Sequence, residues 1–412
     1  MLSTSDQQVT QSEPVNELEE EDIDICLQPD PLKLLNLLAY LLEAGEKTKE
    51  KKLIDINTDN INSIITSSEA TLAAVMNAKS AEMLLNYDKL DQKEDLLFLR
   101  LCLSHIITTV PSTLSQRTKN LIGSDEYNDL KLRAQRLFEL YHQPLAPTLI
   151  NRLDSVVNAY TMDGLVAARI ALCNMKNELL FSDPYGDALI ALDCMESVVI
   201  LIETWNVHVK SLEADYYVRF LLLFDYVFRG TNIKMTRSDS GDDSGDDIGD
   251  TASTATKNVR AHNEKLFAKT TKRSVCDGKI DGIIAYKDLE LSLCEFKPLS
   301  VSLLPLLEQH VKNIMTSSCI FRNLESLRTD PQHHHHHNYG LDFNGNVGTM
   351  FILCSIDGVM VATEVAELII PYDPYDLVVM KNTIALLFDL KTHMKKLAQT
   401  FRPLQEKSKR QR

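Results

Sequence analysis

The chain is poor in glycine and proline, with 14 and 13 of them among 412 residues. Because these two residue types interrupt helices, their scarcity favours a helix-rich architecture. No Cys-x-x-Cys pair occurs among the 8 cysteines, and most of them have apolar neighbours. This pattern argues against a zinc site or a disulfide framework and indicates buried free thiols in a reducing compartment. We therefore expect an intracellular protein, nuclear or cytoplasmic.

Long apolar runs and an excess of positive charge are also missing. No run approaches the ~20 residues that span a bilayer, and the polar start Met1–Asp6 lacks the core of a signal peptide. We expect no membrane partner.

The chain has 43 basic and 58 acidic residues, a formal net charge of −15. This balance argues against broad, unspecific nucleic-acid binding and leaves room for a local basic cleft.

The first half of the chain carries helical periodicity and no recognisable chemistry. We predict a disordered acidic N-terminus over residues 1–29 and a helical region over 30–209, which begins at the capping pair Asp30-Pro31. Protein partners could bind through this helical region. Within it, apolar spacing predicts amphipathic helices over residues 70–90, 92–110, 126–142, 146–160, 163–182 and 186–209.

The second half mixes helical and strand patterns, and it predicts an α/β domain over residues 210–404. An acidic, low-complexity insertion over 237–257 is predicted to be disordered. Its Ser240 and Ser244 suit phosphorylation, and a plain solvated linker is the alternative. A basic tail follows at 405–412. The domain is expected to begin with a helix at 213–228 and a strand at 233–236. A hairpin of strands 280–286 and 289–297, a helix at 302–317 and a loop-rich stretch at 323–348, which contains His333 to His337, are expected next. A second hairpin, of strands 349–356 and 359–368 around the turn Asp357-Gly358, and a helix at 376–401 complete the prediction.

Two charged residues interrupt the apolar face of the strand over 289–297. Leu291 and Leu293 alternate along this strand, and the same face continues into Glu295 and Lys297. Burying these charges beside leucines costs several kcal/mol unless they are paired or meet a metal. Asp281 lies opposite, on the neighbouring strand. A carboxylate pair can hold Mg²⁺ or Mn²⁺, and a nearby lysine can orient or deprotonate a water for attack on a phosphodiester.

At these residues the chain resembles the PD-(D/E)XK nuclease superfamily. Its pattern places an acidic residue on one strand, E-x-K on the next, and often a glutamate on the preceding helix, and Asp281, Glu295, Lys297 and Glu213 match these positions. The resemblance implies an α+β protein whose second part is a restriction-endonuclease-like α/β domain with a mixed central sheet. It also implies metal ligation by Asp281, Glu295 and the backbone carbonyl of Phe296.

Two of these assignments have alternatives. Asp215 can take the place of Glu213, and Asp277 can take the place of Asp281, which follows Ile280 and not the proline of the superfamily pattern. The chain also resembles a group of fungal proteins of uncharacterised function that share its E-F-K strand. The implied activity is divalent-metal-dependent hydrolysis of DNA or RNA. The alternative is an inactive nuclease-fold protein that acts as an interaction scaffold.

Overall fold

The computed structural model describes residues 71–86, 90, 93–204, 213–237, 281–328, 337–372 and 376–411. The predictions made for residues 1–29, for Asp277, for His333 to His336 and for all but the first residue of the 237–257 insertion lie outside these ranges.

A seven-stranded sheet forms the centre of the molecule, in the order β1-β7-β6-β5-β4-β3-β2. The pairs β1/β7 and β4/β5 are parallel, and the other neighbours are antiparallel. The sheet is therefore mixed, and the α+β class is confirmed. Its strands are β1 (Ile106–Thr108), β2 (Ile233–Arg237), β3 (Gly282–Tyr286), β4 (Leu289–Lys297), β5 (His337–Asn344), β6 (Val347–Ile356) and β7 (Val359–Ile369).

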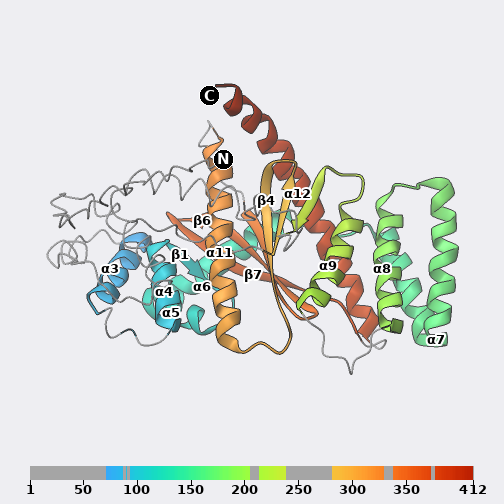
Figure 1. The fold of residues 1–412 in the computed structure, drawn as a ribbon, viewed down its shortest axis with the longest axis horizontal. Coiled ribbons are helices and arrows are strands. Elements are labelled where there is room, and N and C mark those ends of the chain that lie inside the picture. The colour runs from blue at the N-terminus through green and yellow to red at the C-terminus, as the bar shows by residue number, and fades with distance from the viewer. Residues whose placement is uncertain are drawn as a thin grey trace, which may run out of the picture.

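Helices flank the sheet on both faces and at both ends (Figure 1). The helices α3, α4 and α5 lie beyond the β1 edge, and α7 and α8 lie at the opposite end of the molecule. The helices in chain order are α3 (Leu72–Leu85), α4 (Lys93–Leu103), α5 (Thr113–Ile122), α6 (Ser124–Tyr141), α7 (Pro147–Ser182), α8 (Asp187–Thr204), α9 (Glu213–Val227), α11 (Leu303–Ser326) and α12 (Leu377–Gln411).

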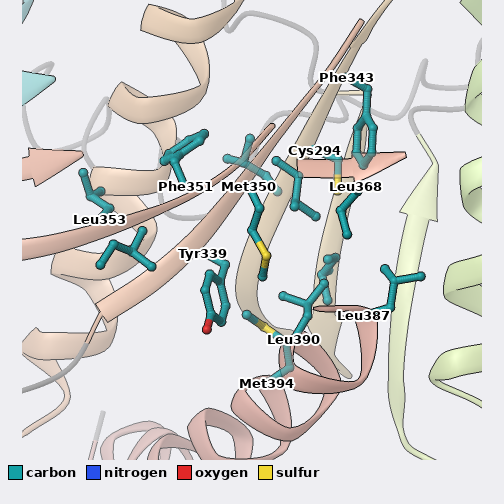
Figure 2. Close-up of a cluster of buried hydrophobic side chains, with 14 of the residues drawn as sticks. Cys294, Tyr339, Phe343, Met350, Phe351, Leu353, Leu368, Leu387, Leu390 and Met394 are labelled. Atoms are coloured by element: carbon teal, nitrogen blue, oxygen red, sulfur yellow. The ribbon is translucent and has the colours of Figure 1, made fainter. Parts of the chain in front are cut away.

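The two faces of the sheet are covered by different helices. The helix α11 packs on β4 and β5 from one side. On the other side, Leu390 and Met394 of α12 point towards Tyr339 and Met350 of the sheet (Figure 2). All four side chains are buried, as expected for a sheet enclosed between helix layers. Both faces of β4 are therefore inside the protein.

The two predicted hairpins are confirmed. Strands β3 and β4 pair in antiparallel fashion, as do β6 and β7. Between β6 and β7, Asp357 has φ 49° and Gly358 has φ 80°. Positive φ at both central residues is typical of the two-residue turns that match strand twist, and glycine adopts it without strain.

Several predicted elements differ in the structure. Residues 106–108, expected within a helix, form β1, because so short a segment does not distinguish helix from strand. Residues 337–344, expected as loop, form β5. The helix α5 was not predicted at all. The basic tail over 405–412 is helical as far as Gln411, since α12 continues through it.

The helix α7 combines two predicted helices. Its backbone leaves the helical range at Gly164, with φ 79° and ψ −168°, close to the predicted break between residues 160 and 163. Among the described residues, α7 is the one helix whose length and composition would suit a membrane span. Core helices of soluble proteins meet the same criterion of length and composition, although only 17% of the apolar window of α7 is buried inside the protein.

Candidate functional site

The end of β4 presents its residues alternately to the two helix layers. Glu295 contacts α11 through Lys312. Phe296 points to the opposite layer, where its ring lies 4.8 Å from the ring of Tyr217 in α9. Because strand side chains alternate, Lys297 lies on the Glu295 side. The opposite face, expected to be polar, is buried at Ser292, Cys294 and Phe296.

Glu295 is enclosed and faces a lysine that the sequence analysis did not identify. Its side chain is 2% exposed, whereas that of Lys312 is 32% exposed. The lysine Nζ lies 2.7 Å from Oε1 and donates a hydrogen bond to Oε2 at 2.8 Å. The contact to Oε1 is an ion-pair distance without hydrogen-bond geometry, so Oε1 accepts no hydrogen bond. The Lys312 ammonium thus lies within ion-pair distance of both carboxylate oxygens of Glu295.

Burial raises the pKa of the Glu295 carboxyl to about 8, and the nearby carboxylates of Asp281 and Asp342 raise it further, while Lys312 lowers it. The loss of hydration raises the pKa of Glu295 by more than Lys312 lowers it, because burial penalises the charged form of a carboxyl group that water does not reach. The carboxylates of Asp281 and Asp342 and the ammonium of Lys312 thus act on the charge of Glu295 in opposite directions. Additional positive charge at this position would stabilise the ionised form of Glu295.

Asp281 lies immediately before β3 and reaches the end of β4. Its Oδ2 accepts a hydrogen bond from the backbone N–H of Phe296 at 2.7 Å. The register pairs Gly282 with Cys294 and Ile283 with Leu293, so Asp281 comes at the position that this register sets opposite Glu295. Asp281 therefore lies near enough to Glu295 for its charge to raise the pKa of the Glu295 carboxyl.

Lys297 ends β4 and is half-buried. Its Nζ donates a hydrogen bond to the backbone carbonyl of Phe296 at 2.7 Å. The ammonium group thus lies beside the carbonyl that the superfamily resemblance assigns as a metal ligand. The two lysines at the site thus each donate to one of its oxygen atoms, Lys297 to the carbonyl of Phe296 and Lys312 to the carboxylate of Glu295.

A third carboxylate, Asp342, extends the site across the sheet, and the sequence analysis missed it. Asp342 of β5 is the register partner of Glu295 in the parallel β4/β5 pair. It accepts hydrogen bonds from Nδ2 of Asn313 and Nδ1 of His310, each at 2.7 Å. The other ring nitrogen of His310 lies 3.1 Å from Oγ1 of Thr108 in β1. These groups form a buried polar layer between α11 and the sheet.

Glu213, the fourth predicted residue, begins α9. The position of its side chain lies outside what the structure describes. Further along α9, Tyr217 and Phe220 pack against the ring of Phe296, so this helix borders the end of β4. The alternative residue Asp215 is exposed.

The donor atoms at the end of β4 suit a hard cation. Carboxylate and carbonyl oxygens are the ligands that Mg²⁺ and Mn²⁺ prefer, and Glu295 supplies a buried carboxylate whose two oxygens contact the Lys312 ammonium in this structure. In the described part of the chain, no group of three or more His, Cys, Asp or Glu side chains is arranged to hold a metal. The oxygen atoms at the end of β4 differ from such a group, because two carboxylates are joined there by the backbone carbonyl of Phe296.

Comparison with protein-family models, with curated proteins and with solved structures finds no match to this chain.

Proposed function

We propose that the protein is a divalent-metal-dependent nuclease whose site lies at the end of the β3–β4 hairpin. The observation that carries this proposal is that Asp281 reaches the end of β4: its Oδ2 lies 2.7 Å from the amide nitrogen of Phe296, the residue after Glu295, and its charge raises the pKa of the Glu295 carboxyl. Two carboxylates at neighbouring strand ends, one of them buried, form an arrangement that a divalent cation stabilises.

The order of elements around the site also supports the proposal. The chain runs through α9, β2, β3, β4, α11 and β5, with β3/β4 antiparallel and β4/β5 parallel. This mixed arrangement agrees with the restriction-endonuclease-like domain that the PD-(D/E)XK resemblance implies. Fold alone does not determine activity, so the proposal depends on the site residues.

Each residue has a distinct proposed role. Asp281, Glu295 and the carbonyl of Phe296 would hold Mg²⁺ or Mn²⁺, which would supply Lewis-acid stabilisation of the phosphodiester oxygens. The Lys297 ammonium, which is held next to that carbonyl, would orient the attacking water by hydrogen bonding and manage its proton. Glu213 would assist from the start of α9. The substrate would be DNA or RNA.

A cleavage assay tests this function. The full chain is incubated with plasmid DNA, single-stranded DNA and RNA in Mg²⁺, in Mn²⁺, or in a chelator. We expect cleavage that needs the metal and that falls by at least ~100-fold in Lys297→Ala, the scale of a lost proton-transfer group. Lys234→Ala is the matched control, because Lys234 is exposed on β2. Cleavage of equal rate in Lys297→Ala would reject the assignment.

The second candidate function, an inactive nuclease-fold scaffold, is favoured by the surface of α7. Val166 and Ile170 lie four residues apart on the part of α7 that follows Gly164 and are exposed, as is Phe181 near the end of the helix. Exposed apolar side chains that gather on one helix face are a feature of interaction surfaces. Calorimetry that detects no Mn²⁺ binding by the full chain would favour this reading over the nuclease.

A further inference from the structure

Lys312 stands between the buried carboxylate of Glu295 and solvent. The lysine is the exposed partner of this ion pair and the glutamate the enclosed one, with side chains 32% and 2% exposed. Nζ approaches both carboxylate oxygens, at 2.7 Å and 2.8 Å. The ammonium group therefore occupies the ligand atoms that Glu295 would offer to a cation.

The position of α11 does not depend on Lys312. Two neighbouring residues on this helix fix it to the sheet: Gln309 donates to the carbonyl of Glu295 at 2.9 Å, and Asn313 donates to the carbonyl of Leu341 at 2.9 Å. The lysine side chain has a flexible four-carbon stem. It can leave Glu295 by rotation of its own bonds while α11 keeps its contacts.

We propose that Lys312 is a built-in counter-ion that holds Glu295 in the metal-free protein and is displaced when a divalent cation binds there. This inference rests on the metal site of the proposed function. A cation held by Asp281 and Glu295 would compete with the ammonium for the same oxygens and would repel it at short distance. Lys312 therefore lowers the affinity of the site for metal, and it sets the cation concentration at which the site fills.

Lys312 and Lys297 play different parts in this arrangement. Lys297 donates to a backbone carbonyl, whereas Lys312 contacts a side-chain carboxylate. Removing Lys312 leaves the proposed water-handling lysine in place. The two variants should therefore separate metal affinity from the chemical step.

Calorimetric titration of the full chain with MnCl₂ tests the inference. We expect Lys312→Met to bind Mn²⁺ at least ~10-fold more tightly than the unmodified chain, a free-energy difference of ~1.4 kcal/mol. Lys234→Met, at an exposed position on β2, should bind as the unmodified chain does. Lys312→Gln, which keeps a hydrogen-bond donor, serves as a second variant, and the melting temperature of each protein is measured with and without Mn²⁺.

A second measurement follows the displacement itself. Amine-reactive labelling of Lys312, read by mass spectrometry, should become faster when Mg²⁺ is added, because the released ammonium exchanges its proton and reacts more readily. Lys234 should be labelled at the same rate in both conditions. Unchanged labelling of Lys312 at saturating Mg²⁺ would overturn the displacement.

The outcomes separate this inference from the function on which it rests. Mn²⁺ binding that is equal or weaker in both Lys312 variants overturns the inference and leaves the metal site standing. Absence of Mn²⁺ binding in every protein overturns both. Failure of both variants to fold, even with Mn²⁺, assigns Lys312 to a structural ion pair and overturns the inference. A double variant, Lys312→Met with Glu295→Gln, should lose the tight binding of Mn²⁺. If it binds Mn²⁺ as tightly as Lys312→Met alone, the cation lies elsewhere and the inference is overturned.

Discussion

Asp342 lies directly across the parallel β4/β5 pair from Glu295, so that two carboxylates occupy one row of the sheet beneath α11. The two residues receive different partners. Asp342 contacts the side chains of Asn313 and His310 on α11, whereas Glu295 contacts the Lys312 ammonium. This difference makes Asp342 a structural member of the polar layer and leaves Glu295 as the residue whose charge depends on a cation.

Replacing Asp342 should destabilise the fold. Asp342→Ala leaves donors on His310 and the fully buried Asn313 without their acceptor, and each unsatisfied buried group costs about 1–3 kcal/mol. Urea unfolding should show a loss of about 2–5 kcal/mol for Asp342→Ala and a smaller loss for Asp342→Asn, which keeps one acceptor. Ser355→Ala, at an exposed position on β6, is the control. Equal stability of the two Asp342 variants would contradict the assigned hydrogen bonds.

The stability of the protein should depend on pH through Glu295. Its pKa rises from an ordinary 4.5 to about 8 in the folded chain. Between these values the folded state binds a proton that the unfolded state has lost. Stability therefore decreases as pH rises through this window and is fully retained below it. Each pK unit corresponds to ~1.4 kcal/mol.

The Glu295→Gln variant isolates this effect, because the amide stays neutral at every pH. We expect the two proteins to differ little in free energy of unfolding at about pH 4.5, and the variant to be the more stable by several kcal/mol near pH 8. Denaturant unfolding at both pH values in the absence of divalent metal measures the difference. A difference in free energy of unfolding between the two proteins that stays constant with pH would mean that the Glu295 carboxyl titrates normally.

Gly340 and Phe351 should behave as a coupled pair. A Cβ atom at Gly340 would lie 2.1 Å from Cζ of Phe351, the residue paired with it across β5 and β6. Gly340→Ala is therefore expected to cost about 1–3 kcal/mol through overpacking. Adding Phe351→Leu should recover part of this loss, and a double-mutant cycle measures the coupling. Additive effects would show that the ring moves aside at no cost.

Sequence patterns predicted the part of the fold that local rules control. The β3–β4 hairpin and the E-x-K end of β4 follow from period-two alternation and a short connection. Strand β5 was missed, although Tyr339, Leu341 and Phe343 alternate, because the polar or small residues between them resemble a loop. In the structure those residues face α11, where Asn313 and His310 bind Asp342.

The partner of Glu295 could not be read from the sequence. The buried charge itself was detectable, since Glu295 continues an apolar face and is 1% exposed. The sequence suggested Lys297 as the neighbouring cation because it lies two residues away on the same face. The closer partner, Lys312, comes from α11, and only the packing of this helix on β4 and β5 brings it there.

The most direct test of the metal site is a crystal of the full chain soaked in MnCl₂, with anomalous scattering recorded for manganese. We expect an anomalous peak within about 2.5 Å of a carboxylate oxygen from both Asp281 and Glu295, with the Lys312 ammonium moved away from Glu295. A saturated crystal with no peak between these two carboxylates, and with Lys312 still paired to Glu295, would contradict the proposed site.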